Sequence, residues 1–214
     1  MKKVYAIPGL GCTKDLFQNI RIPNHELVVL NWPQTKPSES LKAYAQKFLP
    51  QINTNEKVSL IGVSFGGMIC SELIELIETD KVVLISSTKN KKQFPFLLKF
   101  LKVIPLYYFL TNYFFTTGGQ LKRRLLGFDD YYSKLFTDMM SSMRPNYFRH
   151  AINTIVNWQR TENNPKIIQI HGTKDRLMPV SLIDAKYIIK DGSHAMVLTR
   201  AEEINLILNE VFNG

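Results

Sequence analysis

Short apolar runs alternate with helical patterns along most of the chain. The apolar runs are continuous rather than alternating, as expected of parallel strands that helices cover on both faces. Six segments are expected to be strands: residues 4–7, 27–30, 58–61, 82–85, 167–170 and 187–189. Three segments are expected to be helices: residues 40–52, 67–78 and 201–212. This alternation predicts an α/β fold, a three-layer sandwich with a mainly parallel sheet of about six strands.

Two of the expected helices carry further signals. In residues 67–78, apolar side chains follow helical spacing and glutamates lie opposite them. At the start of the last helix, Thr199 and Glu202 stand at capping-box spacing, which predicts Thr199 as the N-cap.

The alternation breaks between about residues 88 and 164. Apolar residues there favour helices, and prolines and glycines punctuate them. We expect three or four helices inserted after the fourth strand. The predicted organisation is one core, made of residues 1–87 and 165–214, with residues 88–164 as a helical insertion.

The net charge of +9 is concentrated in this insertion. Residues 88–160 hold twelve of the 27 lysines and arginines but only three of the 18 acids, so the remainder of the chain is neutral. They also hold 16 of the 24 aromatic residues. Two interpretations stay open: a solvated face, or a docking face for an acidic carrier protein or an anionic membrane surface. Nucleic acid is not expected, because the charges are interleaved with large apolar residues and no recognition module is present.

The sequence also bears on the compartment. Cys12 and Cys70 are too few for a disulfide framework, which indicates a reducing environment. Pro8 and Gly9 end the first apolar run before a signal-peptide core can form. The longest apolar stretch, residues 103–115, is too short and interrupted to span a bilayer. We therefore expect a cytoplasmic protein without a transmembrane segment.

The strongest chemical signal is the pattern G-x-S-x-G at residues 62–66. An apolar strand enters it and a helical pattern leaves it. Such a strand-to-helix turn holds the central serine in a strained conformation with its Oγ exposed, and small residues on either side avoid collisions across the turn. The pattern alone is weak, but its context predicts Ser64 as a nucleophile.

An acid and a histidine follow in the order that this chemistry requires. Asp175 lies just after the fifth expected strand, and His194 just after the sixth, so both belong to the carboxyl edge of the sheet with Ser64. His194 would act as general base, and Asp175 would orient its imidazole. Asp191 is the nearest rival acid, but its place before His194 favours a role in shaping that loop. His171 stands near a strand end, where packing is the expected role.

Acyl transfer further requires donors for an oxyanion. The amide of Phe65 is one expected donor, and the loop after the first strand should supply the other. Pro8 has no N–H, so we assign the second donor to Leu10, with Gly11 as the neighbouring alternative. A dinucleotide site is not expected, because Lys14 stands where the third glycine of the fingerprint belongs. No metal-ligand spacing and no P-loop are present, so no metal or cofactor is expected.

Taken together, these motifs resemble the α/β-hydrolase fold superfamily over essentially the whole chain. The matching features are the glycine loop after the first strand, residues 62–67, His171-Gly172-x-x-Asp175 and Gly192-Ser193-His194, with Trp32-Pro33 like the turn after the second strand. The resemblance implies that residues 88–164 form a lid. The chain departs from the family in having Pro8-Gly9 in place of His-Gly, and in lacking the N-terminal antiparallel strands.

The resemblance and Ser64 together imply a serine hydrolase that cleaves a carboxylic ester or thioester through an acyl-enzyme. The many apolar residues of the insertion indicate an apolar acyl part. These residues are Phe94, Phe96, Leu97, Phe100, Leu101, Ile104, Tyr107, Tyr108, Phe109, Tyr113, Phe114 and Phe115. The alternative is a hydrolase-like protein that binds a small molecule with little or no turnover, because a fold alone does not fix a reaction.

Overall fold

The computed structural model describes residues 1–109, 126–127 and 130–214. Its centre is a six-stranded sheet in the order β2-β1-β3-β4-β5-β6. The strands are β1 (Lys2–Ile7), β2 (His25–Val29), β3 (Val58–Val63), β4 (Thr79–Ile85), β5 (Ile167–Gly172) and β6 (Tyr187–Ile189). Every neighbouring pair is parallel, so the carboxyl ends of all six strands share one edge, and the predicted fold class is confirmed.

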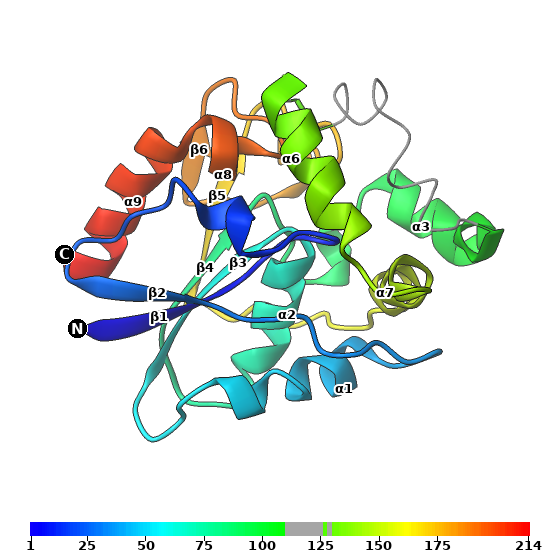
Figure 1. Ribbon diagram of the computed structural model, residues 1–214, viewed down its shortest axis with the longest axis horizontal. Helices are drawn as coiled ribbons and strands as arrows, with labels where there is room; N and C mark the ends of the chain where they lie inside the picture. The colour runs from blue at the N-terminus through cyan, green and yellow to red at the C-terminus, as the bar shows by residue number, and fades with distance from the viewer. Residues whose placement is uncertain (110–125, 128–129) are drawn as a thin grey trace.

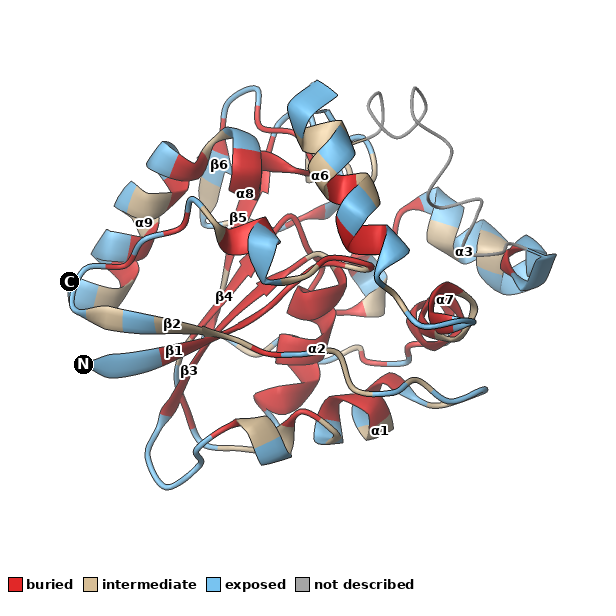
Figure 2. Ribbon diagram, viewed as in Figure 1, coloured by how far each residue is buried: buried red, intermediate tan, exposed pale blue. Residues whose placement is uncertain are grey.

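Helices cover both faces of the sheet (Figure 1). Helices α1 (Leu41–Gln46) and α2 (Phe65–Leu73) pack on one face, and α9 (Ala201–Asn213) lies on the other beside α8 (Met196–Thr199). All six residues of β3 are buried. Figure 2 shows the same burial along the central strands. The continuous apolar runs of the sequence therefore correspond to strands covered on both faces.

Three helix ends differ from the sequence-based expectation. The expected helix over residues 40–52 stops at Gln46, and a short 3-10 segment, Leu49–Gln51, follows it, because Pro50 cannot continue an α-helix. Helix α2 ends at Leu73, five residues before the expected end at residue 78. The predicted capping box is wrong: Thr199 ends α8, and Arg200 precedes α9 with no side-chain cap.

Between β4 and β5 the chain leaves the sheet and forms helices of its own. The described ones are α3 (Phe96–Val103), α6 (Asp130–Ser141) and α7 (Tyr147–Val156), with 3-10 segments η3 (Lys91–Gln93) and η4 (Leu106–Phe109). They lie toward the carboxyl ends of the strands, with α3 and α7 on the right of Figure 1 and α6 at its upper centre. Tyr113, Phe114 and Phe115, named above, lie outside the described residues, as do Lys122, Arg123 and Arg124 of the basic insertion. Within the described ranges, no helix is long and apolar enough to cross a membrane.

Candidate active site

Ser64 occupies a strained turn between β3 and α2. Its backbone angles, φ 53° and ψ −118°, lie in a region that residues with a side chain rarely adopt. The turn leaves no room for a side chain at Gly66, because a Cβ there would lie 2.1 Å from the Ile7 carbonyl oxygen. Ser87, just after β4, donates a hydrogen bond from its Oγ to the Ser64 carbonyl at 2.6 Å. The surrounding strands therefore hold the serine in place.

The structure brings Ser64, His194 and Asp175 together in a hydrogen-bonded chain. His194 Nε2 lies 3.0 Å from Ser64 Oγ, and His194 Nδ1 lies 2.8 Å from Asp175 Oδ2. Because a carboxylate only accepts hydrogen bonds, Nδ1 carries the proton, and the Nε2 lone pair faces the serine hydroxyl. This is the tautomer that a general base requires.

The Asp175 carboxylate is buried and fully hydrogen-bonded. Its Oδ1 accepts the backbone amides of Leu177 and Met178 at 3.0 and 2.8 Å. Burial alone raises the pKa of Asp175, but the charge of His194, the hydrogen bonds from His171 and His194 and the Met178 amide outweigh it. The net result is a pKa well below the usual aspartate value, so this carboxylate stays ionised across the neutral range.

His171 has a role that the sequence did not reveal. Its Nε2 lies 2.7 Å from the Met178 carbonyl and 3.3 Å from Asp175 Oδ2, so the Nε2 proton is directed at both oxygens. Its Nδ1 is buried without a hydrogen-bond partner among the described residues. The sequence signal for this contact was the position of His171 at the end of an expected strand, four residues before Asp175.

Asp191, the rival acid, lies elsewhere. Its Oδ1 forms an exposed ion pair with Lys174 Nζ at 2.9 Å, and its backbone has φ 59°. The loops that carry the acid and the base touch through their main chains: a Cβ on Gly172 would lie 2.1 Å from the Gly192 carbonyl oxygen. Backbone contact therefore sets the spacing between Asp175 and His194.

Leu10 and Phe65, the expected oxyanion donors, line the same cavity as Ser64 and His194. Among the described residues, no acceptor takes a hydrogen bond from either amide. Trp32 contacts both segments. Its ring stacks on the Phe65 ring with centroids 5.4 Å apart, and its Nε1 donates a hydrogen bond to the Cys12 carbonyl at 2.7 Å. The nucleophile turn and the loop after β1 are thereby tied together.

An apolar cavity of about 360 Å³ opens over Ser64. Apart from Ser64, His194 and Cys12, the residues that line it are glycine or carry aliphatic, aromatic or methionine side chains. Burial raises the pKa of the Cys12 thiol, which therefore stays protonated. The insertion forms one wall through Leu97, Leu98 and Leu101 of α3, together with side chains of α6 and α7. The arrangement can admit an apolar group and hold a carbonyl beside the serine.

Comparison with solved structures places this architecture among known folds. A hydrolase from Pseudomonas aeruginosa PA01 superposes with a TM-score of 0.75 at 13% identity, covering 100% of this chain and 91% of that one. A thermophilic esterase from Thermogutta terrifontis gives 0.73 at 14%, covering 98% and 89%. A bromoperoxidase from Bacillus anthracis gives 0.69 at 16%, covering 100% and 92%. The chain has the α/β-hydrolase fold. No protein-family model matches the sequence, and no curated protein is significantly similar to it.

This α/β-hydrolase fold is a reduced one, because its described strands form a single all-parallel sheet. The insertion also contacts the histidine loop: Ala195 N donates to Leu126 O at 3.2 Å, and Ser193 Oγ to Gly127 O at 3.3 Å. Both hydrogen bonds flank His194. The helical insertion therefore contacts the His194 loop as well as forming a wall of the cavity.

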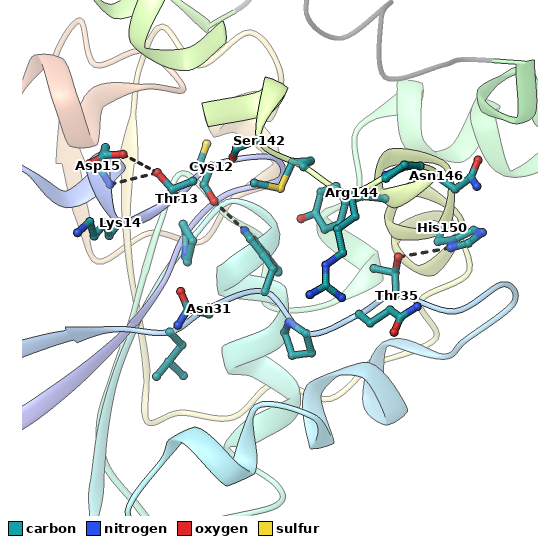
Figure 3. Close-up of a pocket in the computed structure, with 18 residues that line it drawn as sticks. Cys12, Thr13, Lys14, Asp15, Asn31, Thr35, Ser142, Arg144, Asn146 and His150 are labelled. Carbon is teal, nitrogen blue, oxygen red and sulfur yellow. Dashed lines mark hydrogen bonds between the residues drawn. The ribbon is translucent and has the colours of Figure 1, made fainter. Parts of the chain in front are cut away.

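A second, more polar cavity of about 600 Å³ lies across the loop after β1 (Figure 3). The α6–α7 connection contributes Arg144, and α7 contributes His150. The loop after β2 contributes Thr35, whose Oγ1 lies 3.4 Å from His150 Nδ1. Cys12 lines both cavities, whereas Ser64 and His194 line only the first. Within the described residues, no group of three histidine, cysteine or acidic side chains is placed to hold a metal ion.

Proposed function

We propose that this protein is a serine hydrolase that cleaves a carboxylic ester or thioester with an apolar acyl part. The observation that carries the proposal is the continuous chain from Ser64 Oγ through His194 to the ionised Asp175, at 3.0 and 2.8 Å, at the floor of an apolar cavity. The esterase and hydrolase among the structures of similar fold are in keeping with it.

In the first half-reaction, Ser64 Oγ attacks the acyl carbonyl carbon while its proton passes to His194 Nε2. The carbonyl oxygen gains negative charge, which the amides of Leu10 and Phe65 stabilise. When the tetrahedral intermediate collapses, the bond from carbon to the alcohol oxygen or thiol sulfur breaks, and His194 returns the proton to that leaving group. The acyl group then remains on Ser64 as an ester.

In the second half-reaction, water takes the place of the leaving group. His194 removes a proton from the water as its oxygen attacks the acyl carbon, and the same proton returns to Ser64 Oγ when the acid departs. The Asp175 carboxylate accepts the hydrogen bond from His194 Nδ1–H throughout and stabilises the imidazolium. The net reaction consumes one water and releases one carboxylic acid and one alcohol or thiol.

The apolar wall supports the acyl assignment. A charged or strongly polar acyl group would lose its hydration without gaining partners, because almost no polar side chain lines the cavity. An alkyl chain gains from the same surroundings, at about 0.8 kcal/mol for each buried methylene. Leu98 and Leu101 of α3 line this cavity and offer apolar contacts to such a chain.

Turnover of nitrophenyl esters and of acyl thioesters of increasing chain length tests the proposal. Ser64→Ala should lower kcat on the order of 10⁴-fold or more. Ser181→Ala, at an exposed serine far along the chain, is the matched control and should be unchanged. A fluorophosphonate should label Ser64 in the wild type. Leu101→Phe should shift the preference toward shorter acyl chains, because it narrows the cavity. Binding of these compounds without turnover or labelling would instead indicate the hydrolase-like binding protein.

A further inference from the structure

Exposed apolar side chains are concentrated on one part of the insertion. Of the thirteen large apolar side chains that are exposed among the described residues, eight lie between residues 96 and 109. They are Phe96, Leu97, Phe100, Val103, Ile104, Leu106, Tyr108 and Phe109, and we call them the α3–η4 surface. Figure 2 shows α3 largely exposed at the rim of the molecule. Soluble proteins rarely expose such a group without a partner for it.

Three of these side chains are almost completely open to solvent. Phe96 is 80% exposed, Val103 79% and Phe109 83%. The Phe96 ring lies 6.2 Å from the ring of Phe100, so the two project together from the start of α3. Burial of these side chains in an apolar medium would stabilise a bound state by roughly 25 cal/mol for each Å² removed from water.

The charged residues of the segment that carries this surface are all lysines. Lys92, Lys99 and Lys102 are exposed among the apolar side chains. No aspartate or glutamate occurs anywhere between residues 81 and 128 of the sequence. Two other basic residues of the insertion do not contribute, because Lys89 pairs with Asp184 and Arg160 pairs with Glu75, and both basic side chains are largely buried. Lys92, Lys99 and Lys102 therefore place exposed positive charge beside the exposed apolar side chains of this segment.

The opposite side of α3 faces the cavity over Ser64. Leu98 and Leu101 line that cavity and pack against a small cluster that includes Tyr107. Phe96 and Val103 project outward instead. One short helix thus separates the apolar cavity from a basic, apolar outer surface.

We propose that the α3–η4 surface binds anionic phospholipid bilayers. Bulky apolar side chains interleaved with lysines match the boundary between anionic headgroups and acyl chains. An acidic carrier protein fits less well, because its carboxylates would satisfy the lysines but leave Phe96, Val103 and Phe109 against a charged surface. This binding goes beyond the proposed hydrolysis and does not depend on it.

Co-sedimentation with vesicles tests the proposal without any turnover. The probes are vesicles of phosphatidylcholine alone and of equal parts phosphatidylcholine and phosphatidylglycerol, added to the full chain and to its Ser64→Ala variant. Both proteins should pellet with the anionic vesicles and remain in solution with the neutral ones. Raising salt from about 0.1 M to about 1 M, which shortens the screening length from about 10 to about 3 Å, should weaken binding at least tenfold.

Matched variants separate the two contributions. Phe96→Ser, Val103→Ser and Phe109→Ser combined should abolish pelleting, whereas Leu206→Ser with Ile188→Ser, at exposed positions on α9 and β6, should not. Lys99→Glu with Lys102→Glu should weaken binding to anionic vesicles at least tenfold. The control for charge is Lys2→Glu with Lys3→Glu, at the exposed amino end of β1.

Three outcomes would overturn the proposal. The first is equal pelleting with neutral and anionic vesicles, or none with either. The second is binding to a soluble acidic acyl carrier protein, but not to vesicles, that depends on Lys99 and Lys102. The third is a stable dimer in solution that the three serine substitutions dissociate, which would assign the surface to a second copy of this chain. Because Ser64→Ala is included, these outcomes are independent of whether hydrolysis occurs.

Discussion

His171 Nε2 lies 3.3 Å from Asp175 Oδ2, the same oxygen that His194 Nδ1 reaches at 2.8 Å. One carboxylate oxygen therefore serves two imidazole rings, one facing the candidate nucleophile and one buried behind it. His171 touches no reacting atom, so it is a positioning residue that acts through Asp175. Its hydrogen bond is among the interactions that lower the pKa of Asp175.

Replacing His171 should destabilise the protein in a pH-dependent way. His171→Leu removes a buried hydrogen bond and should cost about 1–3 kcal/mol of unfolding free energy at neutral pH. A depressed aspartate pKa contributes stability above the unfolded-state value of about 3.9, and that contribution is lost as pH falls through the folded-state value. The deficit of the variant should therefore shrink below about pH 4 in denaturant titrations. His171→Gln retains a donor and should recover much of the loss, whereas a pH-independent deficit in both variants would indicate packing alone.

The strained backbone of Ser64 predicts that glycine at this position stabilises the fold. A residue with a side chain held at φ 53° and ψ −118° costs about 1–3 kcal/mol, and glycine adopts such angles without that cost. After the extra chain entropy of glycine is subtracted, Ser64→Gly should gain about 1 kcal/mol, or about 2–4 °C in Tm. Ser64→Ala removes the same hydroxyl but keeps the Cβ, so its Tm should stay near that of the wild type. Equal melting temperatures for the two variants would contradict the strain.

The acid limb of the activity profile should report a single proton. The pKa of Asp175 lies well below the usual aspartate value, so this residue adds no second proton to the acid limb. On that limb, kcat/KM should therefore fall tenfold for each pH unit and no faster. A pH series on a neutral nitrophenyl ester measures the slope. A slope of two would mean that a second group near Ser64 must also lose its proton.

Asp175 and Asp191 form a matched pair for testing the acid. Asp175→Asn should lower kcat on the order of 10⁴-fold, because the amide can donate to Nδ1 and stabilise the wrong tautomer of His194. Asp191→Asn breaks an exposed ion pair with Lys174, which is worth at most about 1 kcal/mol, and should leave kcat nearly unchanged. Circular dichroism should show both variants folded. The reverse pattern of activities would move the role to Asp191.

The sequence predicted the sheet well because burial on both faces leaves uninterrupted apolar runs. It also placed Ser64, Asp175 and His194 at strand ends, and a parallel sheet brings strand ends to one edge. The contact of His171 with Asp175 was missed because a lone histidine near a strand end usually packs. Nor could the sequence show that Lys89 and Arg160 are engaged with Asp184 and Glu75, because these contacts join distant segments. The failed capping box at Thr199 has a local cause, since that residue already ends α8.

The chain leaves the sheet after β4 and returns at β5, so the three residues of the hydrogen-bonded chain all belong to the core. The Gly172–Gly192 contact holds two of them at a spacing that no side chain of the insertion sets. Leu97, Leu98 and Leu101, by contrast, stand on the insertion and line the cavity over Ser64. Under the proposed hydrolase function, a library confined to these three positions would vary what enters the cavity while Ser64, His194 and Asp175 keep their geometry.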